Sequence, residues 1–267
     1  MTQLRPLRLL QITDPHLYGD ESRSIYGVNT AVSLRKVLQE AMGEGKALPD
    51  AILATGDIAE DHSRQGYENF RKAIQGFGVP VFVLPGNHDD PTVMSRVLDA
   101  DGFQYCGSAE IGNWGAVFLD THLPGSPAGN LSAGELTRLE SELQRFRGRP
   151  ALFCLHHPPV AVGSAWLDGL GLRNGSAFLE VVDRFPDVRL TLAGHVHQAF
   201  DQVRGAVRML ASPSTCAQFT PGLDNCLMDM RPPGYRWLHL HTDGTAQTEV
   251  MWLQDWVMLE RPRDDRF

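Results

Sequence analysis

Residues 7–16 read LRLLQITDPH, an apolar run that ends in an acidic and an imidazole side chain. The run at 7–12 is short and rich in leucine and isoleucine, which is typical of a buried strand in an α/β protein. Asp14 and His16 follow it directly. Both side chains are therefore expected just beyond the carboxyl end of that strand.

The same arrangement recurs four more times along the chain. Predicted strands at 51–54, 81–84, 151–155 and 190–193 each lead into a polar cluster. These clusters are Gly56-Asp57, Gly86-Asn87-His88-Asp89, His156-His157 and Gly194-His195-Val196-His197. Because ligand sites of α/β sheets gather at the carboxyl ends of strands, five clusters from separate strands can converge on one site.

Amphipathic stretches between these runs predict helices, and one more apolar run predicts a strand at 116–119. The helices are expected at 30–42, 65–77, 92–98, 132–146 and 177–185. Ser132 and Glu135 have capping-box spacing, which supports the fourth of them.

The pattern changes after Ala193, where strands replace helices. They are expected at 199–203, 207–211, 236–240 and 248–253, with Asp243-Gly244 as the hairpin turn between the last two. A front half that alternates strands and helices, followed by a strand-rich part at 198–267, predicts a mixed α/β fold of two layered sheets with helices outside. The sequence contains no repeat or clear linker, so residues 1–267 are expected to form a single domain.

Composition limits the classes of partner. The chain has 267 residues, 42% of them hydrophobic, and a net charge of −8. That charge offers no basic field for nucleic acid. No stretch approaches the roughly 20 apolar residues of a membrane helix, and the N-terminus does not resemble a targeting signal. The four cysteines form no CxxC pair; Cys216 and Cys226 could approach each other, but free thiols in a reducing cytoplasm are favoured.

The polar clusters supply carboxylates, imidazoles and one amide, a set that suits iron, manganese, zinc or magnesium. The predicted metal ligands are Asp14, His16, Asp57, Asn87, His156, His195 and His197. Two metals about 3.5–4 Å apart can clamp the attacking and leaving oxygens of a displacement at phosphorus. Asp57, on the tight turn at Gly56, is the candidate bridging carboxylate. His195 and His197 are two apart, and in an extended segment such residues point the same way.

Each motif alone has an ordinary structural explanation. A lone histidine is more often a hydrogen-bonded polar residue than a ligand, and GNHD or GHVH alone could be a turn or a strand end. The order of the five motifs, each at a strand end, favours a metal site instead.

In that order, D-x-H, G-D, G-N-H-D, H-H and G-H-x-H resemble the signature of the calcineurin-like metallophosphoesterases, from Gln11 to His197. The resemblance implies a four-layer αββα sandwich, with two mixed sheets flanked by helices. It implies that one divalent metal is held by Asp14, His16, Asp57 and His197. It implies that the other is held by Asp57, Asn87, His156 and His195. Fe²⁺ or Mn²⁺ are the first expectation for both metals, and Zn²⁺ or Mg²⁺ are alternatives.

The same resemblance also implies roles at the substrate. A hydroxide that bridges the two metals would be the nucleophile, and His88 would contact the phosphate or protonate the leaving oxygen. The residues expected to bind substrate are His16, Asp57, Asn87, His88 and His197.

A narrower resemblance covers nearly the whole chain. QITDPHL, GVNT, ATGDIAEDHS, SPSTCAQF and the tail PPGYRWLHLHTDGTAQTEV are similar to class III cyclic nucleotide phosphodiesterases of bacteria. This implies hydrolysis of 3′,5′-cyclic AMP to 5′-AMP, which lowers intracellular cyclic AMP, by a cytoplasmic monomer or homodimer. The alternatives are a phosphodiesterase for other cyclic nucleotides or glycerophosphodiesters and, more remotely, a non-catalytic scaffold.

Three further features are open at this point. Glu60 or Asp61 could orient His88 through a hydrogen bond, although a solvated cap for the next helix is favoured. His157 could support the metal site or cover Pro158-Pro159. The segment 164–174, which contains Trp166, Arg173 and Asn174, is either a substrate-facing loop or a packed surface loop.

Overall fold

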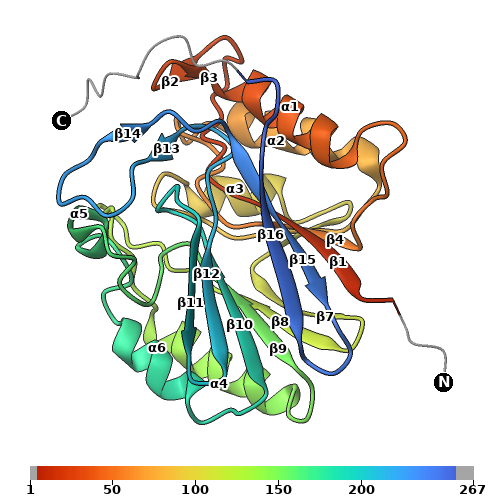
Figure 1. Ribbon diagram of the computed structural model, residues 1–267, viewed down its shortest axis with the longest axis vertical. Helices are drawn as coiled ribbons and strands as arrows, with labels where there is room; N and C mark the ends of the chain where they lie inside the picture. The colour runs from red at the N-terminus through yellow and green to blue at the C-terminus, as the bar shows by residue number, and fades with distance from the viewer. Residues whose placement is uncertain (1–4, 257–267) are drawn as a thin grey trace.

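The computed structural model describes residues 5–256, and within them the strands form two large sheets (Figure 1). The first sheet has the order β16-β15-β1-β4-β5-β6. Its strands are β1 (Leu7–Ile12), β4 (Ala51–Ala54), β5 (Val81–Val83), β6 (Phe103–Tyr105), β15 (Gly234–Leu240) and β16 (Ala246–Trp252). In this sheet β1, β4, β5 and β6 run parallel to one another, whereas β15 pairs antiparallel to β1, so the sheet is mixed.

The second sheet has the order β11-β12-β10-β9-β8-β7. Its strands are β7 (Gly107–Ile111), β8 (Trp114–Phe118), β9 (Ala151–Cys154), β10 (Val188–Ala193), β11 (Phe200–Arg204) and β12 (Val207–Ala211). The four central strands are parallel, and both edge strands, β7 and β11, are antiparallel to their neighbours.

Helices cover the outer face of each sheet. The larger ones are α1 (Thr30–Met42), α2 (Arg64–Ile74), α3 (Pro91–Val97), α4 (Ala133–Arg145) and α6 (Gly175–Val182). Side-chain caps define several starts: Asn29 accepts from Val32, Ser63 from Gly66, and Ser132 from Glu135. Each such cap satisfies a backbone N–H that the helix itself leaves without a partner.

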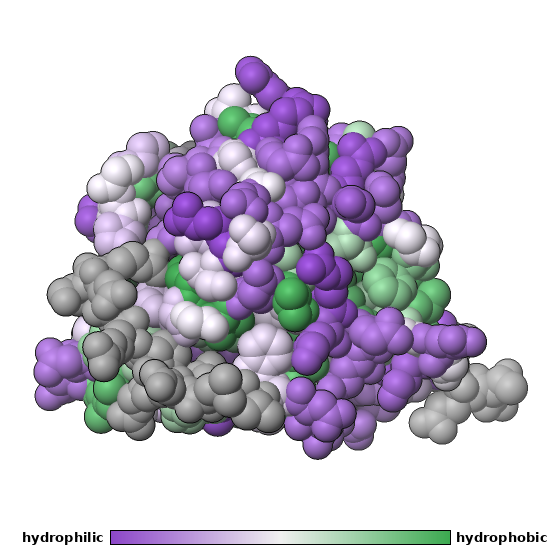
Figure 2. Space-filling view, turned by 90° about the horizontal axis from the view of Figure 1, so that it is seen from above, coloured by the Kyte–Doolittle hydropathy of each residue, from purple (hydrophilic) through white to green (hydrophobic). Residues whose placement is uncertain are grey.

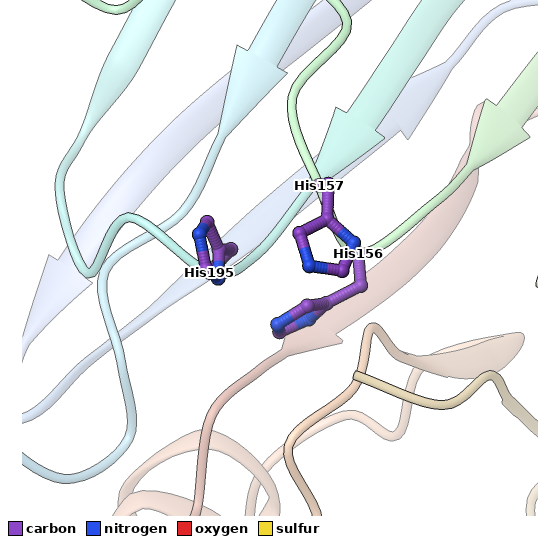
Figure 3. Close-up of side chains that lie close together, drawn as sticks. All are labelled: His156, His157 and His195. Atoms are coloured by element: carbon purple, nitrogen blue, oxygen red, sulfur yellow. The ribbon is translucent and has the colours of Figure 1, made fainter. Parts of the chain in front are cut away.

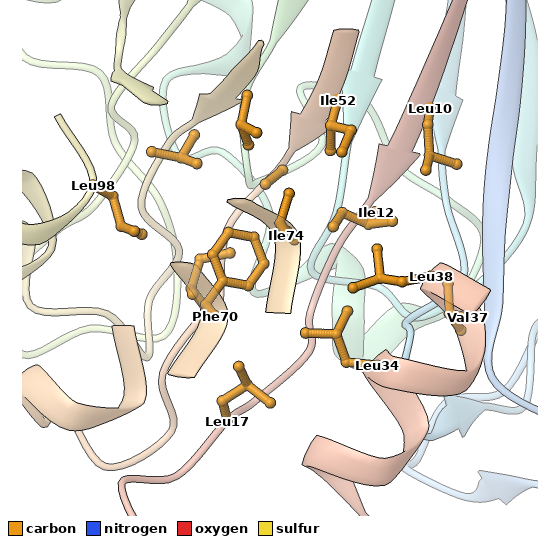
Figure 4. Close-up of a cluster of buried hydrophobic side chains, with 14 of the residues drawn as sticks. Leu10, Ile12, Leu17, Leu34, Val37, Leu38, Ile52, Phe70, Ile74 and Leu98 are labelled. Atoms are coloured by element: carbon orange, nitrogen blue, oxygen red, sulfur yellow. The ribbon is translucent and has the colours of Figure 1, made fainter. Parts of the chain in front are cut away.

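Successive side chains of β1 point to opposite faces of the sheet and pack in different cores. Leu10 and Ile12 pack with Leu34, Leu38 and other residues of α1 and α2 in one core, as Figure 4 shows. Leu9 points to the other face of the sheet and packs in a second core with residues of β8, β9 and β10. A third core joins the second sheet to α4 and α6. The order is therefore helix, sheet, sheet, helix, which confirms the predicted four-layer fold.

Burial explains why this arrangement is stable. The three cores contain leucine, isoleucine and phenylalanine side chains that are almost completely buried. Removing one such side chain from water is worth roughly 1.5–3 kcal/mol, so the two apolar faces of each sheet supply the main driving force.

Most predicted elements are confirmed, and the differences have local causes. The predicted helix at 65–77 is observed as α2, which ends at Ile74, followed by a 3₁₀ turn, η1 (Gln75–Phe77), and the left-handed conformation of Gly78 ends this turn. The strands β6 and β7 were missed. The first is only three residues long, and the second, GSAEI, is an edge strand with one buried side chain.

The molecular surface is mainly polar. The face in Figure 2 has apolar side chains gathered near its middle among polar ones. None of the helices between residues 5 and 256 combines the length and apolar character needed to cross a membrane.

Candidate metal centre

The five polar clusters meet at one place, as their positions after strands predicted. They follow β1, β4, β5, β9 and β10, which supply loops from both sheets. Ligand atoms of Asp14, His16 and His197 lie within 4.8 Å of one another, and so do those of Asp14, Asp57 and His156. The two sheets therefore contribute to a single buried cluster.

The backbone at these loops differs from the extended form assumed for pairs two residues apart. Asp14 has a φ of 52°, His16 of 47°, His195 of 68° and His197 of 47°. Asp57 has a φ of 51°. Such left-handed conformations are uncommon for residues with a Cβ and are costly unless the surroundings impose them. The extended geometry predicted for His195 and His197 was wrong, because each loop turns sharply as it leaves its strand.

Hydrogen bonds between the loops maintain these conformations. The backbone N–H of Asp14 donates to the Gly56 carbonyl at 3.0 Å, and that of His16 donates to the Asp57 carbonyl at 3.0 Å. The first two clusters are thus held against each other before any ligand is considered.

Two glycines allow the loops to approach closely. Gly56 has a φ of +100°, and a Cβ there would collide with the imidazole of His156. A Cβ on Gly194 would collide with the Thr13 side chain and lie 2.8 Å from Asp14 Oδ2. Both positions need glycine because neighbouring clusters occupy the space of a side chain.

Hydrogen bonds fix which nitrogen each imidazole presents to the cluster. Nδ1 of His156 donates to the Thr55 carbonyl at 2.8 Å, and Nδ1 of His197 donates to the Ala217 carbonyl at 2.7 Å. His16 Nδ1 donates to Glu60 Oε2 at 2.8 Å. With Nδ1 protonated, each neutral ring leaves an Nε2 lone pair, which is the usual form of a metal-binding histidine.

On one side of the cluster, electron-rich atoms face each other. His16 Nε2 lies 3.2 Å from His197 Nε2, and His197 Nε2 lies 3.4 Å from Asp14 Oδ1. Two lone pairs and a carboxylate at these distances repel one another unless a cation lies among them.

On the other side, Asp57, Asn87 and His156 converge. His156 Nε2 lies 3.2 Å from Asp57 Oδ2 and 3.2 Å from Asn87 Oδ1. His195 Nε2 is buried and has no hydrogen-bond partner within residues 5–256. A buried polar atom without a partner is costly in a folded protein, and a metal ion would satisfy this one.

Two buried carboxylates without a neighbouring lysine or arginine in the described part of the pocket favour a cation at the cluster. Asp14 and Asp57 are 0% and 2% exposed, and no lysine or arginine lines the adjoining pocket among the described residues. Burial opposes a charged His156, yet the Asp57 and Asp14 carboxylates outweigh it and raise the pKa of His156 to about 9, so its Nε2 lone pair favours a cation, which is either a proton or a metal ion. Burial, with the neighbouring His156, lowers the pKa of His195 to about 3. The carboxylates thus favour positive charge, and the donor set fits two divalent ions.

His157 is placed with the histidines but has other partners (Figure 3). Its ring lies 4.6 Å from that of His195 and 4.8 Å from that of His156. Nε2 donates to the Pro127 carbonyl at 3.2 Å, so Nδ1 accepts from the Thr121 hydroxyl at 2.8 Å. Burial holds the pKa of His157 well below its usual range. Both nitrogens are used, so His157 supports the ligand loops and is not itself a ligand.

Glu60 is not the solvated helix cap that was favoured from the sequence, because it contacts two histidines of the cluster. Its Oε2 accepts from His16 Nδ1 at 2.8 Å and from His88 Nδ1 at 3.1 Å. Burial alone would raise the pKa of Glu60, but these hydrogen bonds outweigh it and hold the pKa well below its usual range. Asp61 instead accepts from the backbone of Gly19 and Ser63. Glu60 therefore orients two residues of the cluster at once.

Glu60→Gln should weaken metal binding and activity by roughly 10–100-fold, the usual cost of losing a partner that orients a ligand. The amide keeps the volume but removes the charge that holds the His16 Nδ1 proton. Asp61→Asn is the matched control, because this neighbouring carboxylate accepts from the backbone of Gly19 and Ser63 instead of from a histidine of the cluster. Metal retention against graded chelator concentrations measures the effect, and equal losses in both variants would contradict the assigned role.

A pocket opens beside the cluster. The polar residues that line it are His16, Asp57, Asn87, His88, His195 and His197. Trp166 also lines it, so the segment 164–174, whose role the sequence left undecided, does face the pocket. Arg173 and Asn174 do not line it; they bond to Ser126 and Leu131.

The prediction from sequence missed Tyr26, Pro127 and Phe219 in the pocket lining, and within the segment 164–174 it did not single out Leu167 and Leu170. Isolated aromatic and apolar residues carry no signal in a sequence beyond that of the core. Phe219 is a partial exception, since it lies in SPSTCAQF, a segment that the metal chemistry did not explain.

Comparison with known proteins identifies the class. Residues 7–199 match the family model of the calcineurin-like phosphoesterases, so this chain belongs to that family of metal-dependent hydrolases. The match contains all five polar clusters and confirms the resemblance found in the sequence.

Similar relatives are more specific. The chain is 41% identical to the 3′,5′-cyclic adenosine monophosphate phosphodiesterase CpdA of Escherichia coli strain K12, over 93% of this chain and 90% of the relative. It is 39% identical to the CpdA of Pseudomonas aeruginosa, over 93% and 91%. It is 36% identical to a 3′,5′-cyclic-nucleotide phosphodiesterase of Nostoc, over 94% of each. A dimetal phosphatase from Danio rerio shares the fold, with a TM-score of 0.65, 16% identity and coverage of 94% and 100%.

Proposed function

We propose that this protein hydrolyses 3′,5′-cyclic AMP to 5′-AMP at a two-metal site. The observation that carries the proposal is the buried cluster of carboxylates and imidazole lone pairs beside a pocket that is also lined by apolar and aromatic side chains. The relatives named for this activity match nearly the whole chain and support the choice of substrate.

We assign the seven predicted ligands to the two ions as the family pattern implies. One ion would be held by Asp14, His16, Asp57 and His197. The other would be held by Asp57, Asn87, His156 and His195, with Asp57 shared. When bound, the two ions supply Lewis-acid chemistry, in which they withdraw charge from a phosphoryl group and acidify coordinated water.

The residues of the chain prepare this site in three ways. Backbone carbonyls of Thr55 and Ala217 hold the Nδ1 protons of His156 and His197 away from the cluster. The Glu60 carboxylate holds His16 in the same way and also accepts from His88 Nδ1. Loops from both sheets exclude water from the carboxylates, which are almost completely buried.

His88 is the proposed general acid. Its side chain is 35% exposed, lines the pocket and contacts Glu60. Nδ1 is engaged by Glu60, so Nε2 is the nitrogen that would deliver a proton to the leaving sugar oxygen. We propose His16, Asp57, Asn87, His88 and His197 as the residues around the bound phosphate.

Several broader properties belong to the same proposal. Fe²⁺ or Mn²⁺ are the proposed ions, since nitrogen and oxygen donors suit them. All four cysteines, which lie within the described residues, are free thiols and support a cytoplasmic location. Antiparallel pairing of β15 with β1 joins the strand-rich end to the start of the chain and supports one domain. We propose a monomer or homodimer.

Product analysis tests the substrate and the bond that breaks. Purified protein with Mn²⁺ or Fe²⁺ should convert cyclic AMP to 5′-AMP, and chelation should stop the reaction. Chromatography resolves 5′-AMP from 3′-AMP. Formation of 3′-AMP, or much faster turnover of a glycerophosphodiester than of cyclic AMP, would contradict the proposal.

A further inference from the structure

Two chemically distinct groups of residues line the pocket. Besides the polar residues of the metal cluster, it is lined by apolar and aromatic side chains that we call the apolar wall. The apolar wall consists of Tyr26, Pro127, Trp166, Leu167, Leu170 and Phe219. None of these residues is among those proposed above to bind metal or phosphate.

The apolar wall begins directly at a predicted metal ligand. The ring of Phe219 is stacked on that of His197, with centroids 4.5 Å apart and planes 19° apart. Trp166 meets Phe219 edge-on at 5.0 Å, and Tyr26 meets it edge-on at 6.1 Å. A group attached to a phosphate at the cluster would therefore reach these rings first.

Contacts behind the apolar wall hold it in place. Trp166 and Leu167 lie on α5 (Ala165–Asp168), and Leu167 is 2% exposed in a small core with Val196 and Ala217. Ser164, which precedes α5, accepts from the backbone of Gly222 at 2.9 Å and from Gln198 Nε2 at 3.2 Å. The apolar wall is thus built onto the loop that carries His197, and it needs no rearrangement to form.

The chemistry of the apolar wall selects one kind of group. It contains no carboxylate, lysine or arginine. Only two of the six side chains carry a polar group, namely Trp166 through Nε1 and Tyr26 through its hydroxyl. Trp166 Nε1 is buried away from solvent. A flat aromatic group can stack on such a surface, whereas a charged or strongly polar group would lose its hydration without compensation.

We propose that the apolar wall binds the nucleobase of the substrate, and that it does so by stacking and apolar contact, with Trp166 as the main specificity-determining residue. The inference rests on the proposed function, because it takes the phosphate to lie at the metal cluster. It assigns the discrimination between a cyclic nucleotide and a simple phosphodiester to the aromatic side chains.

The experiment compares substrates with and without a base. Cyclic AMP and ribose 3′,5′-cyclic phosphate, which lacks the base, present the same reacting phosphate. Trp166→Ala should lower kcat/KM for cyclic AMP roughly 5- to 100-fold, the range that loss of one base–aromatic stack produces. It should change kcat/KM for the abasic compound less than about twofold, because the phosphate end is untouched.

Binding supplies a second readout. The Kd of 5′-AMP should rise in Trp166→Ala while the Kd of inorganic phosphate and the metal content stay unchanged. Trp166→Phe should restore most of the affinity, since it restores a ring. Trp252→Ala is the matched control, because Trp252 lies on β16 and does not line the pocket. Leu170→Trp, which narrows the pocket from a partly buried position, should also impair cyclic AMP selectively.

The outcomes separate the two proposals. If wild-type protein hydrolyses cyclic AMP and Trp166→Ala lowers kcat/KM equally for both substrates, the assignment of the apolar wall to the base is wrong and the proposed function stands. If wild-type protein does not prefer cyclic AMP to the abasic compound, the base site is also wrong. If wild-type protein hydrolyses neither compound, the proposed function itself is overturned.

Discussion

Asp57→Ala should lose both metal ions and on the order of 10³-fold or more in activity, because several kcal/mol of transition-state stabilisation depend on the metals. Asp57 lies within reach of both halves of the cluster. Its Oδ2 is 3.2 Å from His156 Nε2 and 3.9 Å from His16 Nε2. Elemental analysis after reconstitution with excess metal measures the first effect, and cyclic AMP turnover the second.

Two further variants make this result interpretable. Asp57→Asn preserves the shape and an oxygen but removes the charge, and it should retain more metal than alanine does. Asp120→Ala removes a half-buried carboxylate that bonds to the His122 backbone and lies outside the cluster. It should keep two ions. Full metal content and activity in folded Asp57→Ala would refute the assignment of Asp57 as the shared ligand.

His88→Ala should lower the turnover rate of cyclic AMP roughly 10²-fold or more, since a positioned imidazole contributes about 10²–10⁴-fold to the rate of a proton-transfer step. The 3′ oxygen leaves as a strongly basic alkoxide unless it receives a proton. A nitrophenolate leaves readily without one. The turnover rate of bis(4-nitrophenyl) phosphate should therefore fall far less in the same variant.

Metal content distinguishes the possible roles of His88. We expect it to be unchanged, because His88 is not among the assigned ligands and contacts Glu60 through Nδ1. Equal losses on the two substrates would remove the acid role and leave the metal site intact. A fall in metal content would show instead that His88 helps to build the site.

The sequence was sufficient to predict the layers and the position of the cluster. Strong apolar runs such as 7–12 and 51–54 fixed the central strands, and each polar cluster began where its run stopped. Ser132 marked the start of α4 because a capping side chain is a local signal. These features could be predicted because they depend on near neighbours in the chain.

The parts that could not be predicted depend on contacts between distant residues. The left-handed backbone at His195 and His197 follows from the packing of loops from both sheets. Glu60 reaches His16, which is 44 residues away, and that contact overrides the helix cap that its position suggested. The apolar wall joins Tyr26, Trp166 and Phe219 from three separate segments, and no periodicity in the sequence links them.

Metal stoichiometry of the wild-type protein tests the central claim most directly. Protein reconstituted with excess Mn²⁺ or Fe²⁺ and then freed of unbound ions should contain two ions per chain by elemental analysis, and it should convert cyclic AMP to 5′-AMP in that state. One ion per chain or fewer, with cyclic AMP turnover intact, would contradict the two-metal account.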